Sequence, residues 1–594
     1  MRLDLLIDAL RRPAAYPWLG APEPEADPEW QAEVIQTHIS VVFLVDRDVI
    51  KIHKPVDLGF LDFTTLAARK RDCEAEVEVN AELAPGIYRG VAAIVRRGDQ
   101  VVVERELDQL DDLDASDAEL VEWAVWMRRL PESATFQQLL ERRALARPQL
   151  WSLAATLASF YRDGAERAAA HPELTRYGDL ETVSENLREN FAQLDAIIDE
   201  ARSAGRPEPI DRDLITRLRN ASENELAKLR ELIRARFQAG KIRDTHGDLR
   251  LDHVYHLGCI RPGYPDRGRP GYPSRGRPAD AELVDAELLD AIGRRELLIV
   301  DRIEFNDRFR WADPIADVAF LIMDLQARGA WQLARCFADD FINASQDREG
   351  EALLPFYTGY RATVRAKVAA IAAAELERGP EACAQARAKA EARARLALVE
   401  LSRPRERPCM VLVAGLPGTG KSVLARALRE TGGFVWIRSD EVRKRLAGLD
   451  PLADHHGEIG EGLYTKAWSD RTYTACLERA AEICTAGGRA LVDASFTDGE
   501  RREAFVSAAI AWGVPVHLLV VSAPPEIVHE RLRAREKAPQ RDPSDATVAV
   551  YEAARTRWSP VDPTLCRFNQ IDASGSPREM LAEANQALAR AGLG

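Results

Sequence analysis

The sequence predicts two domains, an N-terminal α+β domain and a C-terminal α/β domain with a parallel sheet and a helical lid. Three observations lead to this prediction. The chain has 594 residues, which is too long for one hydrophobic core. Residues 415–422 form a complete phosphate-loop motif between a strand-like and a helix-like segment. A charged, proline-bounded linker at 401–408 precedes that strand, so we expect domains at 1–400 and 409–594.

Composition narrows the class of protein. The net charge of −14 argues against a protein that coats nucleic acid nonspecifically. The eight cysteines are scattered and form no CxxC pair, which fits a reducing cytoplasm. The first twelve residues are amphipathic and carry acids, unlike a signal peptide, and no apolar run approaches a membrane span. We therefore expect a cytoplasmic protein with no membrane association and no obligatory protein partner.

The phosphate loop predicts a nucleoside triphosphate ligand with Mg²⁺. An apolar run at 409–414 precedes it, and residues 423–428 have helical composition. The glycines let backbone N–H groups curl around phosphates at the positive end of the following helix. The predicted nucleotide-binding residues are Gly415, Leu416, Pro417, Gly418, Thr419, Gly420, Lys421 and Ser422. Lys421 would reach the terminal phosphates, and the Ser422 hydroxyl would bind Mg²⁺.

Strand-like runs then alternate with helical ones, which predicts a parallel sheet with helices on both faces. The runs are 434–437, 489–493, 516–521 and 566–571. Ligands of such sheets lie at the carboxyl ends of the strands.

Charged residues follow these strands. Asp440 could accept a proton from an acceptor hydroxyl, and Arg443 could hold an acceptor-side anion. The alternative is a helix cap and a surface arginine. Asp493 ends an apolar strand and could bind Mg²⁺ or the acceptor, or else be a turn residue. Arg531 and Arg535, one helical turn apart, could close over the transferred phosphate as a lid, or belong to a solvated helix.

These segments resemble the P-loop kinases of the polynucleotide kinase, zeta-toxin and chloramphenicol phosphotransferase group. The likeness lies in GLPGTGKS at 415–422, SDEVRK at 439–444, LVDAS at 491–495 and the arginine-rich segment 531–541. It implies that Asp440 is the general base and that Arg443 contacts the acceptor. That group phosphorylates alcohols on very different molecules, so the resemblance implies the type of reaction but not the substrate. The acceptor could be a small sugar-like alcohol, a nucleic acid 5′-hydroxyl or a protein.

The strongest N-terminal signal is Thr245-His-Gly-Asp-Leu-Arg-Leu-Asp-His253, followed by the apolar run 297–300 that ends at Asp301. In this arrangement Asp248 would take the hydroxyl proton, and His253 and Asp301 would bind Mg²⁺. HGDLRLDHV at 246–254 and IVDRIEF at 299–305 resemble the aminoglycoside phosphotransferase and protein-kinase-like fold. The resemblance implies a bilobal domain, with a small lobe at 28–130 and a helical lobe at 131–400.

Other parts of that fold occur in the expected order. Residues 40–54 predict a hairpin, and Lys51 is our choice for the phosphate-binding lysine. A helix over 68–82 offers Glu74, Glu76 and Glu78 as its ion-pair partner, and Glu76 is preferred. Residues 122–127, with Glu122 and Ala124, are interpreted as the hinge that holds the adenine ring. The sequence departs from the family pattern in lacking GxGxxG and in carrying His253 in place of Asn.

Both halves together resemble the bacterial bifunctional aminoglycoside phosphotransferase/ATP-binding proteins. This predicts an ATP-dependent phosphotransferase with two kinase-type sites. Two alternatives stay open. The N-terminal half could be an inactive kinase-like sensor of the C-terminal kinase. The chain could also be an ATP-switched partner or RNA-binding protein, in which case the eight-residue Arg-Pro-Gly-Tyr repeat at 261–278, otherwise a tolerated surface loop, would contact RNA.

Overall fold

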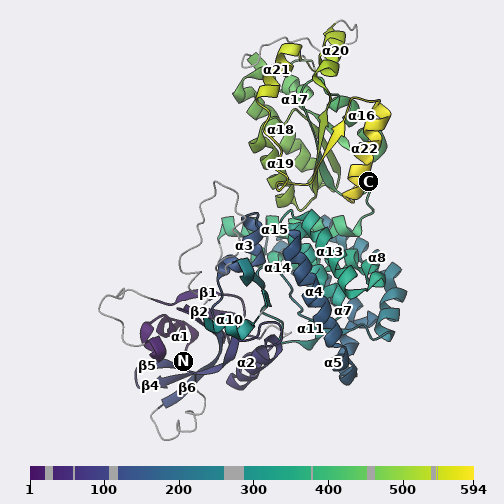
Figure 1. The fold of residues 1–594 in the computed structure, drawn as a ribbon. Helices are drawn as coiled ribbons and strands as arrows, with labels where there is room; N and C mark the ends of the chain where they lie inside the picture. The colour runs from purple at the N-terminus through teal and green to yellow at the C-terminus, as the bar shows by residue number, and fades with distance from the viewer. Residues whose placement is uncertain are drawn as a thin grey trace. The chain divides into compact units, whose positions relative to one another are not determined.

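The computed structural model describes residues 1–19, 31–57, 61–105, 118–259, 286–293, 295–375, 379–450, 462–536, 544 and 546–594 (Figure 1). Its contacts divide the chain into two compact units. The first comprises Met1–Asp179, Arg236–Leu321 and Asp340–Gln346, and the second comprises Leu180–Ala235, Ile322–Asp339 and Asp347–Gly594. The domain boundaries expected from the sequence stay a prediction. The repeat at 261–278 lies outside the described residues.

The first unit contains an antiparallel sheet of six strands in the order β1-β2-β3-β6-β4-β5. The strands are β1 (Glu33–Gln36), β2 (Ser40–Val45), β3 (Asp48–His53), β4 (Tyr88–Arg97), β5 (Gln100–Glu104) and β6 (Ala118–Arg128). The hairpin predicted at 40–54 is confirmed, because β2 and β3 pair through a turn in which Asp46 has a φ of 49°. Asp tolerates this left-handed conformation better than most residues.

Two helices cover opposite faces of this sheet, α1 (Leu3–Leu10) and α2 (Leu66–Asn80). Ile50 and Ile52 of β3 pack with α1 in one buried cluster. Val125, which pairs with Lys51, packs with Cys73 of α2 in another. Because side chains alternate along a strand, Lys51 lies on the α2 face.

The other elements of this unit include helices and two short ladders, and strands of these ladders flank residues 245–253, the HGD segment, along the chain. The helices are α3 (Phe136–Glu141), α4 (Arg147–Asp163), α5 (Ala165–Ala170), α6 (Pro172–Thr175), α10 (Ala286–Ile292) and α11 (Asp307–Arg310). Two short ladders pair β7 (Arg243–Asp244) with β10 (Trp311–Ala312) and β8 (Val254–His256) with β9 (Leu297–Ile299). The segment 245–253 therefore connects β7 to β8, and Asp301 follows β9.

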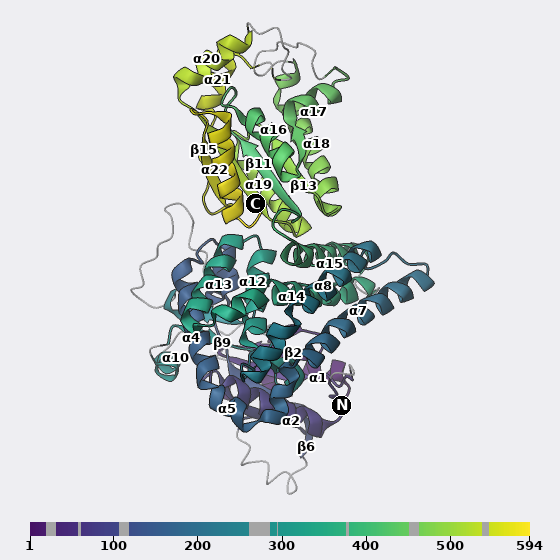
Figure 2. The ribbon, with the colours of Figure 1, turned by 90° about the vertical axis from the view of Figure 1, so that its right-hand side faces the viewer.

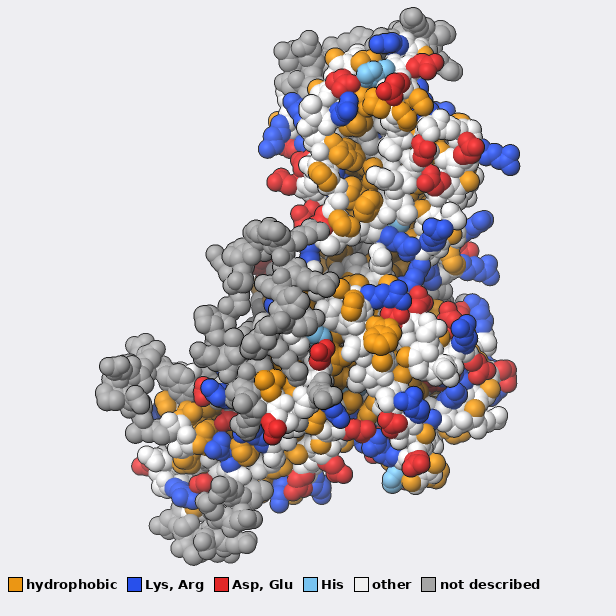
Figure 3. All heavy atoms as spheres, in the orientation of Figure 1, with side chains coloured by type: hydrophobic (Ala, Val, Ile, Leu, Met, Phe, Trp, Pro, Cys, Tyr) orange, Lys and Arg blue, Asp and Glu red, His pale blue; other side chains and the backbone are white. Residues whose placement is uncertain are grey.

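Long helices make up part of the second unit. They are α7 (Leu180–Ser203), α8 (Arg212–Gln238), α12 (Pro314–Ala327), α13 (Trp331–Ser345), α14 (Leu354–Ala374) and α15 (Pro380–Leu401), of which α8, α12 and α13 also reach into the first unit. On the face drawn in Figure 3, the acidic and basic side chains of the described residues are interspersed.

The phosphate-loop domain, residues 409–594, has a parallel five-stranded sheet in the order β12-β13-β11-β14-β15. The strands are β11 (Cys409–Ala414), β12 (Val435–Arg438), β13 (Arg489–Asp493), β14 (Val516–Ser522) and β15 (Phe568–Asp572). The four strands predicted after the loop are confirmed, with shifts of one or two residues at some ends. Every residue of the central strand β11 is buried, as expected for a strand covered on both faces.

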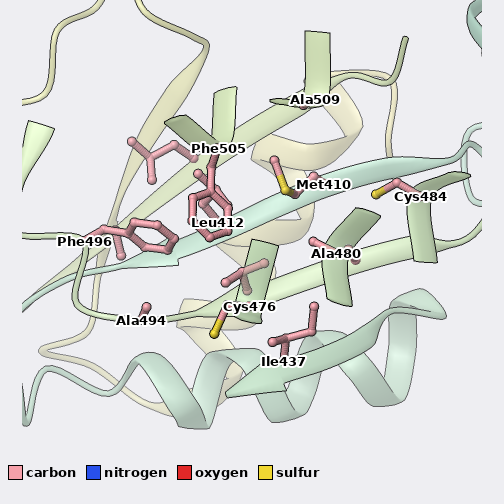
Figure 4. Close-up of a cluster of buried hydrophobic side chains, with 14 of the residues drawn as sticks. Met410, Leu412, Ile437, Cys476, Ala480, Cys484, Ala494, Phe496, Phe505 and Ala509 are labelled. Atoms are coloured by element: carbon pink, nitrogen blue, oxygen red, sulfur yellow. The ribbon is translucent and has the colours of Figure 1, made fainter. Parts of the chain in front are cut away.

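Helices cover both faces of this sheet (Figure 2). They are α16 (Lys421–Gly432), α17 (Ser439–Leu446), α18 (Lys466–Thr485), α19 (Gly499–Trp512), α20 (Pro525–Glu536), α21 (Val548–Thr556) and α22 (Pro577–Arg590). Met410 and Leu412 pack with Cys476 of α18 and Phe505 of α19 (Figure 4). The alternate residues of β11 pack with α16 and α22 on the other face. This two-sided core fixes the carboxyl ends of the strands, where the phosphate loop begins.

Candidate active site

The phosphate loop, residues 415–422, connects β11 to α16. The backbone φ angles of Gly415, Gly418 and Gly420 are 147°, 80° and 105°. A Cβ on Gly415 would lie 2.3 Å from the carbonyl oxygen of Val521, and one on Gly418 would lie 2.8 Å from Leu532 Cγ. Glycine is therefore required at both positions, and the backbone turns in the way that a phosphate cradle needs.

Lys421 and Ser422, at the end of this loop, lie beside Asp493, and these three side chains are the candidates to hold phosphate and magnesium. The Ser422 hydroxyl donates a hydrogen bond of 2.7 Å to Asp493 Oδ2. Lys421 Nζ donates one of 2.9 Å to the carbonyl oxygen of Leu416, at the start of the loop. Asp493, at the end of the neighbouring strand β13, is 3% exposed. Hydroxyl and carboxylate oxygens are the hard ligands that Mg²⁺ prefers.

Burial makes the charges of this site costly. It raises the pKa of the Asp493 carboxyl, although Lys421 and Ser422 act in the opposite direction. It also lowers the pKa of the Lys421 ammonium, although Asp493 and Asp440 act in the opposite direction. Phosphates and a divalent cation would compensate both charges, so the residues present fit a magnesium nucleotide.

Asp440 and Arg443 lie on α17, which follows the edge strand β12. The last residue of that strand, Arg438, pairs with Asp493 in the sheet, so Asp440 follows close to Asp493. Arg443 is 8% exposed, and its guanidinium donates to the carbonyl oxygen of Leu463 at 2.7 Å. The alternative of a surface arginine is therefore wrong. The structure places Arg438, rather than Ser439 or Asp440, at the N-cap of α17, and the Arg438 side chain makes no capping hydrogen bond.

The lid arginines lie on α20, beside the phosphate loop. The Arg531 guanidinium donates to the carbonyl oxygens of Ala573 at 2.7 Å and Thr419 at 3.3 Å. Arg535 donates to the carbonyl oxygen of Ala546. Both side chains are half-buried, so they are not simply part of a solvated charged surface. Arg541, the other arginine of the predicted lid, lies outside the described residues.

One cavity of about 530 Å³ brings these groups together. Its lining includes the predicted residues Pro417, Gly418, Gly420, Lys421, Ser422, Asp440, Arg443, Asp493, Arg531 and Arg535. It also includes residues to which the sequence assigned no role, among them Arg438, Ser469, Tyr473, Thr497, Arg501, Arg557, Ala573 and Met580. Arg438 ends a strand two residues before Asp440, a signal that could have identified it. The others come from helices and loops distant in sequence.

The first unit brings Lys51 together with Glu76 and Asp301. Lys51 Nζ lies 2.8 Å from Glu76 Oε1 and 3.6 Å from Asp301 Oδ1. The ion pair predicted between Lys51 and Glu76 is therefore present. Glu74 and Glu78 are exposed on the other side of α2. The second hairpin lysine, Lys54, donates instead to the carbonyl oxygen of Thr37.

The HGD segment is held by Asp317, which is fully buried. Its carboxylate accepts hydrogen bonds from the backbone N–H groups of His246 and Gly247, at 2.8 and 2.9 Å, and from the Tyr161 hydroxyl at 2.6 Å. Burial lowers the pKa of His246 to about 4, so its ring is neutral, and Nδ1 accepts a hydrogen bond from the Asp248 N–H. His246 thus supports the backbone of this loop.

The metal-binding residues predicted here also lie together. His253 Nε2 is 3.3 Å from Asp301 Oδ2, and its Nδ1 is 2.9 Å from the carbonyl oxygen of Asp248. The Asp248 carboxylate lies 3.3 Å from Arg250 Nε. Among the described residues, no group of three or more His, Cys, Asp and Glu could hold a metal ion. The pairs Ser422–Asp493 and His253–Asp301 would therefore need phosphate or water oxygens to complete a coordination sphere.

The interpretation of residues 122–127 as a hinge is wrong. Glu122 and Ala124 lie inside β6, which pairs with β3 and β4 on its two sides. Glu122 is ion-paired with Arg69 at 2.9 Å, and Ala124 is fully buried. A strand in the middle of a sheet has no backbone groups left for a nucleotide base. The connection to the helices begins only after Arg128, where β6 ends.

Comparison with known proteins supports the class of the phosphate-loop domain. Residues 410–561 match the AAA_33 family model, described as an AAA domain. With its parallel sheet and phosphate loop, this part of the chain has the fold of a P-loop kinase domain, a class that binds nucleotides, typically with Mg²⁺. A UPF0200 protein of Methanothrix thermoacetophila is 31% identical over 138 residues, which are 23% of this chain and 71% of that protein. Through this stretch the chain belongs to the UPF0200 family.

A relative that matches most of the chain carries no activity in its name. An uncharacterized protein of Mycobacterium tuberculosis is 28% identical over 551 residues, 92% of this chain and 93% of that protein. A gluconokinase from Sinorhizobium meliloti is 19% identical, with a TM-score of 0.23, and the match covers 31% of this chain and 93% of that chain.

Within the described ranges, no helix is long and apolar enough to cross a membrane.

Proposed function

We propose that this protein is an ATP-dependent phosphotransferase and that residues 409–594 transfer the γ-phosphate of a nucleoside triphosphate to an alcohol. One observation carries the proposal. The phosphate-binding Lys421, the Ser422–Asp493 pair and the candidate base Asp440 line the same cavity at the carboxyl ends of neighbouring strands. Phosphoryl transfer needs little more than such positioning and charge stabilisation.

Each residue has a defined task in the reaction. The loop N–H groups and Lys421 hold the phosphates, and Asp440 accepts the proton of the acceptor hydroxyl. The acceptor oxygen then forms a bond to the γ-phosphorus while the bond from that phosphorus to the oxygen of the leaving diphosphate breaks. Arg531 and Arg535 stabilise the charge that develops on the transferred group. Mg²⁺, held by Ser422 and Asp493, would supply further charge neutralisation.

Transfer of labelled γ-phosphate tests this proposal. The acceptor panel would contain sugars, sugar acids, nucleosides, aminoglycosides and oligonucleotides with a 5′-hydroxyl. Lys421→Ala should abolish labelling of every acceptor that the phosphate-loop domain uses. Lys466→Ala is the matched control, because Lys466 is exposed at the first position of α18. Equal labelling by wild type and Lys421→Ala would refute the assignment.

A second kinase-type site in the N-terminal region is also proposed. The observation that favours it is the chain of contacts from Glu76 through Lys51 and Asp301 to His253. In a bilobal protein-kinase-like domain, such a lysine would bind phosphate and Asp301 would bind the metal ion, with Asp248 as the base. If Asp248 is not needed for transfer to any acceptor, the alternative of a kinase-like sensor is favoured.

A further inference from the structure

We infer that Arg502 is a positioning residue for the phosphoryl acceptor. It holds two segments together at the wall of the phosphate-loop cavity, the loop 494–498 after β13 and the segment 557–560 after α21. This inference rests on the proposed function and adds a residue to which the sequence assigned no role. Arg502 does not itself line the cavity, so it acts through the residues that it holds.

The loop 494–498 lies on the side of the cavity where the acceptor has to bind. It follows Asp493, the last residue of β13 and the candidate magnesium ligand. The neighbouring strand β12 leads to the candidate base Asp440. Ser495 and Thr497 of the loop line the cavity. Their hydroxyl groups therefore belong to the β12–β13 side, where an acceptor hydroxyl has to lie for Asp440 to take its proton.

The backbone of this loop is strained at Phe496, between the two hydroxyl residues. Its φ of 47° lies in the left-handed region, which bulky residues rarely adopt. The side chain is fully buried, and its ring lies 5.4 Å from that of Tyr473 and 5.1 Å from that of Phe505 (Figure 4). Such strain persists only where the surroundings hold it, and it gathers at functional sites. The shape of the loop thus depends on side chains outside it.

Two side chains from helices hold the strained residue. The Arg502 guanidinium, on α19, donates a hydrogen bond of 2.6 Å to the carbonyl oxygen of Phe496. The Tyr473 hydroxyl, on α18, accepts one of 3.0 Å from the Phe496 N–H. Arg502 is only 1% exposed, and a hydrogen bond from a charged donor is stronger than one between neutral groups. Both polar backbone groups of Phe496 are therefore fixed.

The same guanidinium also holds the segment 557–560. Its Nη2 donates to the carbonyl oxygens of Ser559 and Pro560, at 2.8 and 2.9 Å. The Ser559 N–H in turn donates to the carbonyl oxygen of Thr497 at 2.9 Å. Arg557, which directly follows α21, lines the cavity. One buried guanidinium thus joins two segments that are distant in sequence and that both contribute residues to the cavity wall.

The alternative is an arginine that only stabilises the fold. Loss of such an arginine reduces the amount of folded enzyme and hence the apparent kcat, but the folded molecules keep their KM. Loss of a positioning residue moves the groups that meet the acceptor, so the KM for the acceptor rises even in folded protein. The KM for ATP should stay unchanged, because the phosphate loop does not touch Arg502. The two roles are therefore separable by kinetics.

The test uses full-length protein, labelled ATP and five acceptors: D-glucose, D-gluconate, adenosine, kanamycin and an oligonucleotide with a 5′-hydroxyl. Arg502→Met should raise the KM for every labelled acceptor at least about tenfold. Arg502→Lys should recover part of this loss, because it keeps the charge but cannot bridge both segments. Thr497→Val, which keeps the shape of the side chain and loses only the hydroxyl, should also raise the KM for the acceptor.

Arg489→Met is the matched control. Arg489 is likewise a buried arginine, 5% exposed, that donates to backbone carbonyl oxygens, those of Pro404 and Leu593. It begins β13, at the end away from the loop, and does not line the cavity. Its replacement should lower Tm and leave both KM values unchanged. A rise in the acceptor KM of this variant equal to that of Arg502→Met would overturn the inference.

The remaining outcomes also decide. An unchanged acceptor KM in the Arg502 variants, or an equal rise in the KM for ATP, would leave Arg502 with a structural role only. If neither Arg502 variant folds, Thr497→Val decides in the same way. If no acceptor shows Lys421-dependent labelling, that result counts against the proposed function. Hydrogen exchange then tests the inference: the Phe496 and Ser559 amides should exchange faster in Arg502→Lys than in wild type, and equal rates would overturn it.

Discussion

Replacing Asp493 by asparagine should show how the negative charge of Asp493 affects the stability of the fold and how it affects the binding of magnesium ATP. Asp493 is 3% exposed and accepts a hydrogen bond from the Ser422 hydroxyl at 2.7 Å. Asparagine has nearly the same shape and keeps a carbonyl oxygen for Ser422. The substitution therefore removes the negative charge with little change in packing.

Without nucleotide, Asp493→Asn should make the protein more stable at neutral pH. Burial raises the pKa of the Asp493 carboxyl even though Lys421, Ser422 and Arg438 act against it. The folded state thus holds this proton more tightly than the unfolded state, whose pKa is near 3.8. Its contribution to stability is greatest below pH 3.8 and is lost as the pH rises through the folded pKa. At neutral pH the charge destabilises the fold, so its removal should raise Tm.

With nucleotide, the same substitution should weaken binding. A hydrogen bond or ligand contact from a charged group contributes about 1.5–3 kcal/mol. Because 1.4 kcal/mol corresponds to a factor of ten, the affinity for magnesium ATP should fall roughly 10- to 150-fold. The affinity for ATP measured with a chelator in place of Mg²⁺ should change much less.

Two measurements test the reasoning. Thermal unfolding without ligand gives Tm, and isothermal titration with ATP, with and without Mg²⁺, gives the affinities. Asp498→Asn is the matched control, since Asp498 caps α19 through its side chain and asparagine caps helices equally well. A lower Tm together with an unchanged affinity for magnesium ATP would refute the assignment of Asp493 as a magnesium ligand.

Three further predictions concern other parts of the chain. Asp248→Asn should abolish labelling of a subset of acceptors different from the subset lost in Lys421→Ala, and a full acceptor profile in this variant would favour the sensor alternative. Gly415→Ala should lower the free energy of unfolding in urea by about 1–3 kcal/mol, because its Cβ would lie 2.3 Å from the Val521 carbonyl oxygen. An unchanged urea midpoint would contradict that backbone geometry. Burial lowers the pKa of His517 to about 4 from 6.5, so the unfolded state binds its proton first on acidification. His517 thus contributes stability above pH 6.5 that falls by about 1.4 kcal/mol per pH unit down to about pH 4. The Tm of His517→Gln should therefore fall less than the Tm of the wild type between pH 6.5 and 4.5. An equal fall in both proteins would disprove this.

The parts predictable from the sequence are those that local physics controls. The phosphate loop needs consecutive glycines and a strand and helix on either side, all within about twenty residues of chain. The hairpin at 40–54 and the four strands after the loop follow from apolar runs between turn residues. The position of Asp493 at a strand end follows in the same way, and its hydrogen bond to Ser422 confirms that the two residues meet.

The hinge shows where local reasoning fails. Residues 122–127 are apolar with one acid, a pattern that does not distinguish the last strand of a sheet from the connection after it. Strand pairing shows that residues 122–127 belong to the strand, because β6 pairs with β3 and β4 close to its end at Arg128. The buried Glu122 is ion-paired with Arg69, which comes from a helix distant in sequence.

By itself, the sequence determined the class of chemistry, since a phosphate loop with its lysine and serine is a continuous segment whose backbone geometry depends on its own glycines. Only the tertiary structure decided which acidic and basic side chains lie together at each of the two candidate sites. Glu76 meets Lys51 because its side of α2 faces the sheet, while Glu74 and Glu78 point to solvent. Arg438 is the last residue of β12, and Arg501 lies on the helix after β13. Both line the phosphate-loop cavity because these two strands end at the same edge of a parallel sheet. Such long-range contacts are set by packing between elements, which local sequence patterns do not encode.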